Sequence, residues 1–126
     1  MNSRTYTALK TPVIGRVVML NRYMIDYGKK AYKLIQHNYI DSILKEGVLL
    51  FKHCYRQLLG LNYTKRALET AYEIQAQAYF ISSIGGWPAK VSAVIDEYCE
   101  NIIQDISKIS QNHQVKNNED ECAGWY

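Results

Sequence analysis

Residues 39–59 read YIDSILKEGVLLFKHCYRQLL, and they contain the clearest helical pattern in the chain. At 100° per residue, the apolar positions of this stretch recur every three or four residues and share one face. They are Ile40, Ile43, Gly47, Leu50, Phe51, Cys54 and Leu58. Three cations, Lys45, Lys52 and Arg56, fall on the opposite face. The stretch therefore predicts an amphipathic helix with a buried apolar side and a basic exposed side.

The same periodicity predicts three further helices, over 13–35, 63–84 and 88–110. In the first of them, Val18 and Ile25 are assigned to the buried side together with the other apolar positions. That buried side comprises Ile14, Val17, Val18, Met24, Ile25, Gly28, Ala31, Tyr32 and Ile35. Each predicted helix thus carries an apolar stripe to bury against its neighbours.

Short turns join the predicted helices. Gly60 ends one helix, and Gly85-Gly86-Trp87-Pro88 separates the last two, with Pro88 suited to a first helical turn. Helices joined by turns of a few residues run antiparallel to their neighbours. We therefore predict an all-α fold, an antiparallel up-down-up-down four-helix bundle over 13–110. An N-terminal lead-in (1–12) precedes it, and a polar flexible tail (111–126) follows.

Charge is divided between the two halves of the chain. Residues 1–66 hold twelve basic and three acidic side chains, whereas residues 67–126 hold three basic and nine acidic ones. In the first helix, Arg22, Lys29 and Lys33 have the same i, i+7, i+11 spacing as the three cations of the second. Two positive ridges on adjacent helices predict a basic side that attracts phosphate or an acidic surface. Solvated helix faces with no partner are the alternative interpretation.

A separate apolar strip lies on the helix over 63–84. Leu68, Tyr72 and Tyr79 fall too far around this helix to share its buried seam. Tyrosines that keep their hydroxyls in water along the flank of a bundle are one interpretation. A subunit interface in a homo-oligomer is the other.

Motifs for catalysis, metal binding or membrane insertion do not occur in the sequence. The three cysteines lack CxxC spacing, no two histidines lie four residues apart, and neither a P-loop nor a GxGxxG motif occurs. We therefore predict no enzyme activity, no cofactor and no metal. No apolar run approaches the 18 or so residues of a membrane span, and residues 1–10 have no apolar signal region. This pattern predicts a cytoplasmic protein that does not bind membranes.

Five tracts carry a resemblance that covers residues 12–110. They are the Pro12 lead-in, NYIDSILKEGVLLF (38–51), RQLLGLN (56–62), the Lys65-Arg66 pair and IDEY (95–98). In these tracts the chain resembles one family of four-helix-bundle proteins. This family includes products of intervening sequences in bacterial 23S rRNA genes and the accessory variability determinants (Avd) of diversity-generating retroelements.

This resemblance, of which we favour the Avd branch, implies a homopentamer whose basic surface binds RNA or an RNA/DNA hybrid. It also implies association with a reverse transcriptase that makes mutagenic cDNA from template RNA. Lysine and arginine suit such a role independently, because they neutralise phosphates without reading bases. The candidate nucleic-acid-binding residues are Arg16, Arg22, Lys29, Lys30, Lys33, Lys45, Lys52, Arg56, Lys65 and Arg66.

Two other functions remain open. One is a helical adaptor that binds protein through Leu68, Tyr72 and Tyr79 and does not bind nucleic acid. The other is an rRNA intervening-sequence protein. A small enzyme would need a composite site at a subunit interface, which nothing in the sequence supports.

Overall fold

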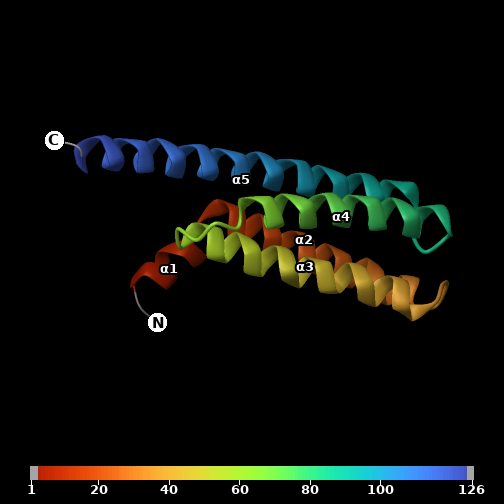
Figure 1. Cartoon of the computed structure of the whole chain (residues 1–126). Coiled ribbons are helices and arrows are strands. Elements are labelled where there is room, and N and C mark those ends of the chain that lie inside the picture. Colours follow the sequence, from red (N-terminus) through yellow and green to blue (C-terminus); the bar gives the residue numbers. More distant parts are fainter. Residues whose placement is uncertain (1–2, 125–126) are drawn as a thin grey trace.

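Helices occupy nearly all of the chain (Figure 1). The structure is a computed structural model, which describes the backbone of residues 3–124 and the side chains of residues 5–110. The helices are α1 (Ser3–Leu9), α2 (Pro12–Ala31), α3 (His37–Leu58), α4 (Thr64–Ser83) and α5 (Ala89–Gly124). Because residues 3–124 form no strand, the all-α prediction is confirmed. None of these helices is long and apolar enough to cross a membrane over the described residues.

The core lies between the four long helices. Both α2 and α4 pack against α3 and α5, and in Figure 1 the helices α3, α4 and α5 each run back along the helix before them. The apolar seams of all four point inward and exclude water, which is the main favourable term in folding. The largest fully buried side chains of the core are Leu20, Met24, Ile40, Ile43, Leu50, Ile74, Ile81, Ile95, Ile102, Ile106, Val13 and Val17.

The assignment of Val18 and Ile25 to the buried side of the first helix was wrong. Their side chains are 39% and 43% exposed, whereas Leu20 is fully buried. Val18 follows the buried Val17 by one residue, which rotates it by 100° and turns it away from the core. Ile25 likewise follows the buried Met24 by one residue and is turned away from the core.

Both ends of the chain differ from the sequence expectation. The predicted lead-in contains α1, whose Thr5 hydroxyl hydrogen-bonds the Tyr55 hydroxyl of α3 at 3.2 Å. A helix of seven residues is too short for periodicity to reveal. At the other end α5 continues to Gly124, through most of the segment predicted as a flexible tail. Residues 89–123 contain neither Pro nor Gly, so nothing in them breaks the helix.

The turns set the positions of the helix ends. Gly60 and Gly85 adopt positive φ, 87° and 85°, which suits glycine after a helix C-terminus. Trp87 is buried, and its Nε1 donates to the Ala78 carbonyl of α4 at 3.1 Å. Its indole therefore holds the turn between α4 and α5 against the core.

Candidate nucleic-acid interface

Cations line the outer faces of α2 and α3. Asn21 of α2 donates its amide to the Gly47 carbonyl of α3 at 3.1 Å and to the Val17 carbonyl at 2.8 Å. This contact sets the middle of α2 against the middle of α3, so the two predicted cation stripes run along neighbouring helices. The stripes are exposed except for Arg56, which is half-buried. They consist of Arg22 and Lys29 on α2, Lys33 in the turn that follows it, and Lys45, Lys52 and Arg56 on α3. The first helix was predicted to reach residue 35 but ends at Ala31, so Lys33 does not continue the helical stripe.

None of these six cations forms an ion pair with a described side chain, although Lys45 and the neighbouring Glu46 interact electrostatically. The ion pairs formed by the described side chains are Arg16 with Asp105 of α5, and Lys65 with Glu69 at 4.0 Å. Neither pair includes a residue of the two stripes. Cations that form no ion pair attract anions over roughly 8 to 10 Å at physiological ionic strength.

Four of the ten candidate residues lie apart from the stripes: Arg16 and Lys30 on α2, and Lys65 and Arg66 on α4. Arg16 faces α5, where it forms its ion pair with Asp105. Lys30 lies with its ammonium 5.0 Å from the ring centroid of Tyr27, whose own ring is 4.7 Å from that of Tyr23. Tyr23 in turn contacts Tyr98 of α5, with 6.1 Å between the centroids. The α5 side of α2 is thus occupied by tyrosines and by an ion pair between the two helices.

The turn between α3 and α4 gathers a second basic group. Arg56, near the end of α3, and Arg66, in the first turn of α4, each place the guanidinium carbon 5.1 Å from the ring centroid of Tyr63. The ring of His53 stacks on the same tyrosine, with 5.5 Å between centroids and 25° between planes. We call these four residues the turn cluster. Periodicity did not reveal this group, because Tyr63 precedes α4 and belongs to no helical face.

Burial and charge both act on His53. Loss of solvation lowers the pKa of its imidazole from 6.5, and the positive charges of Arg56, Arg66 and Lys52 lower it further. The Nδ1 atom is buried and has no hydrogen-bond partner. The first turn of α4 contains no acid, so the positive end of its helix dipole adds to the field of the arginines. The turn cluster is therefore a concentrated positive site at one end of the stripes.

The predicted apolar strip is only partly exposed. Tyr72 and Tyr79 are 54% and 72% exposed on the outer face of α4. Leu68 is partly buried and packs against the core. The structure therefore leaves the two tyrosines, rather than all three residues, free to contact a partner.

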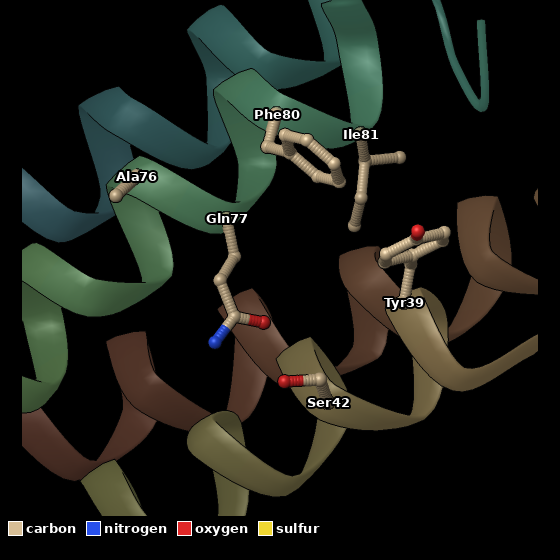
Figure 2. Close-up of a pocket in the computed structure, with 6 residues that line it drawn as sticks. All are labelled: Tyr39, Ser42, Ala76, Gln77, Phe80 and Ile81. Carbon is tan, nitrogen blue, oxygen red and sulfur yellow. The ribbon is translucent and has the colours of Figure 1, made fainter. Parts of the chain in front are cut away.

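A shallow groove of about 220 Å³ runs between α3 and α4. Figure 2 shows Tyr39, Phe80 and Ile81 at its apolar end and the Gln77 amide and Ser42 hydroxyl at its polar end. The Tyr39 and Phe80 rings lie 5.3 Å apart. Small-molecule pockets usually enclose roughly 300 to 1,000 Å³, so this groove is small for one.

Neither a metal site nor a reactive thiol occurs in the described part of the chain. The side chains of residues 5–110 contain no group of three or more His, Cys, Asp or Glu placed to bind a metal ion. Burial raises the pKa of the Cys54 and Cys99 thiols to about 12. These thiols are protonated at neutral pH and are poor nucleophiles.

No protein-family model matches the chain, and neither a curated protein nor a solved structure matches it. The placement of the charged and aromatic side chains therefore carries the functional argument.

Proposed function

We propose that this protein is a non-catalytic accessory protein of a diversity-generating retroelement, similar to Avd. In this proposal α2 to α5 form an up-down-up-down four-helix bundle, which presents the outer faces of α2 and α3 to RNA or an RNA/DNA hybrid. The protein acts in the cytoplasm, where it associates with a reverse transcriptase and supports mutagenic cDNA synthesis. The supporting observation is the pair of cation stripes on α2 and α3, which form no ion pairs with the described side chains.

The geometry of the stripes suits contacts with the nucleic-acid backbone. The α3 stripe runs eleven residues, from Lys45 to Arg56, or about 16 Å at 1.5 Å per residue, and Arg22 and Lys29 lie seven residues, or about 10 Å, apart on α2. Lysine and arginine along such a ridge neutralise phosphates, release counterions and contact no particular base. Recognition by charge and shape is expected of an accessory protein that must follow a template of any sequence.

Charge reversal on α3 tests the proposal. Lys45→Glu/Lys52→Glu should reduce binding of a single-stranded RNA to background, while Lys90→Glu/Lys108→Glu should bind as the wild type does. Both double variants change the net charge equally, and all four lysines are exposed.

Binding is measured by fluorescence anisotropy at several salt concentrations. Six phosphate contacts with a single strand give a slope of log Kobs against log salt concentration of about −4. Equal affinity of the two double variants would refute the role of the stripe.

Association with the polymerase is tested separately. The reverse transcriptase encoded nearest to the gene should co-purify with the wild-type protein. The two proteins should then elute together from a gel-filtration column. If the gene lies instead within a 23S rRNA gene, the intervening-sequence branch of the resemblance is favoured.

A protein-binding adaptor is the second candidate, because Tyr72 and Tyr79 are exposed on α4. It predicts a flat salt dependence and no RNA binding. It further predicts that a protein partner is lost in Tyr72→Ser/Tyr79→Ser.

A further inference from the structure

Two positive charges share one aromatic ring at the turn between α3 and α4. Because Arg56 and Arg66 each lie 5.1 Å from the Tyr63 centroid, their guanidinium carbons are no farther apart than twice that distance. Neither arginine forms an ion pair with a described side chain. Like charges at this separation repel each other, and an anion placed between them would offset the repulsion.

The position of Tyr63 is set by α3. Its backbone N–H donates to the side-chain oxygen of Gln57 at 2.8 Å, and Gln57 is buried. The stacked ring of His53 supports the tyrosine from the same helix. A guanidinium that rests against a fixed ring loses less side-chain freedom on binding, and it keeps N–H donors for a ligand.

The start of α4 adds to this attraction. The Ala67 N–H bonds to the Tyr63 carbonyl at 2.9 Å, which is the first hydrogen bond of the helix. Backbone N–H groups before that point have no partner within the helix and carry its positive partial charge. Phosphate oxygens fit such an end when basic side chains flank it, as Arg56 and Arg66 do here.

We propose that Arg56 and Arg66, positioned by Tyr63, form a phosphate clamp that binds a phosphodiester group of single-stranded nucleic acid. This inference rests on the proposed function and specifies one contact within it. The clamp is a preformed site at the end of the α3 stripe, and its affinity depends on an uncharged side chain. A plain stripe of cations has no such dependence.

His53 reports occupancy of the clamp. The charged groups that act on it are Lys52 and Arg56 of its own helix and Arg66 of α4, and all three are cations. A bound phosphate opposes their field, so binding raises the pKa of His53. By linkage, phosphate binding is then accompanied by proton uptake and strengthens as the pH falls toward the pKa of the free state.

Substitutions at Tyr63 separate the clamp from the general effect of charge. Tyr63→Leu keeps every cation, and it should weaken RNA binding about tenfold without changing the salt slope. Tyr63→Phe keeps the ring and should bind as the wild type does. Arg56→Gln/Arg66→Gln removes two phosphate contacts. It should therefore reduce the magnitude of the log-log salt slope of RNA binding by about 1.4 to 1.8. Tyr72→Leu is the matched control, since it makes the same change at an exposed tyrosine of α4.

Direct titration of His53 tests the clamp even if Tyr63→Leu does not fold. The His53 ring resonances are followed against pH in the wild type, with and without inorganic pyrophosphate. The pKa should rise with pyrophosphate in the wild type and not in Arg56→Gln/Arg66→Gln. An unchanged pKa in the wild type would overturn the clamp.

The two failures are distinguishable. If wild-type protein binds RNA but folded Tyr63→Leu binds it as tightly as Tyr63→Phe, the clamp is refuted and the proposed function stands. If wild-type protein binds no RNA, the proposed function is refuted, and so is nucleic acid as the ligand of the clamp. This holds whether or not pyrophosphate raises the pKa of His53.

Discussion

At the residue scale, burial governs the chemistry of the cysteines. Cys54 and Cys99 are 2% and 0% exposed. Loss of solvation raises the pKa of both thiols to about 12, with a smaller contribution from Asp105 at Cys54 and from Asp96 and Glu100 at Cys99. At pH 8 the thiolate fraction of such a group is on the order of 10⁻⁴.

Both thiols should therefore resist labelling in the folded protein. In a Cys122→Ser background, a chromogenic disulfide reagent at pH 8 should react with neither Cys54 nor Cys99 in buffer and with both in guanidinium chloride. Cys122 is replaced because its side chain lies outside the described residues. Labelling of the folded protein at the rate of an exposed thiol would contradict the burial of these residues.

His53 should make stability depend on pH. Its pKa in the folded state is lowered from 6.5, mainly by burial and then by Arg56, Arg66 and Lys52. Between the folded value and 6.5 the unfolded chain binds more protons, so stability decreases as the pH falls through this range. Lowering the pH from 7.5 to 5.5 should reduce the Tm of the wild type more than that of His53→Gln. Equal reductions in thermal melts would show that the histidine makes no contribution.

At the element scale, two helical glycines occupy opposite environments. Gly15 on α2 is exposed, and a Cβ added there would meet nothing within 4 Å. Gly47 on α3 is buried where α2 approaches, and a Cβ there would lie 2.8 Å from Met24 Cε and collide with Asn21 Oδ1. Close packing of α2 on α3 thus depends on the missing side chain of Gly47.

Alanine at the two sites should change stability in opposite directions. Gly47→Ala should lower the free energy of unfolding by about 1 to 3 kcal/mol, because it forces Asn21 away from the Gly47 carbonyl. Gly15→Ala should raise it by about 0.5 to 1 kcal/mol, since alanine is the better helix former. Urea denaturation followed by circular dichroism measures both. Stabilisation by Gly47→Ala would mean that α2 and α3 do not approach so closely.

Helix positions were predictable because apolar periodicity is a local signal. The expectation for α3 was 39–59 and its observed bounds are His37–Leu58, while the end of α4 was expected at 84 and falls at Ser83. Local patterns did not predict the existence of α1, which is short, or the exposure of Val18 and Ile25. Apolar residues near the edge of a stripe become buried or exposed according to where the neighbouring helix packs.

At the scale of the whole molecule, the homo-oligomer of our proposal would need an interface, and the exposed aromatic side chains of α4 are the candidate for it. Tyr72 and Tyr79 contribute large exposed rings on the outer face of α4. Tyrosine is enriched at protein interfaces because its ring is apolar and its hydroxyl can still bond to water or a partner.

If the protein forms this proposed homo-oligomer through α4, removing these rings should reduce the size of the oligomer. Tyr72→Ser/Tyr79→Ser should show a smaller native mass than the wild type by light scattering, with helicity retained. Tyr6→Ser serves as control, because Tyr6 is also exposed, at 52%, but lies on α1. An unchanged mass in the double variant would place any subunit interface elsewhere.

The amino-acid sequence by itself determined the helical class, the approximate helix bounds and the cation stripes on α2 and α3. Each of these follows from residue order and a rotation of 100° per residue, which needs no knowledge of distant contacts. Only the tertiary structure decided which cations form ion pairs: it paired Arg16 with Asp105 and left the cations of both stripes without an ion pair among the described side chains. It also assembled the turn cluster, because residues from α3, the turn and α4 meet only when the chain folds back on itself.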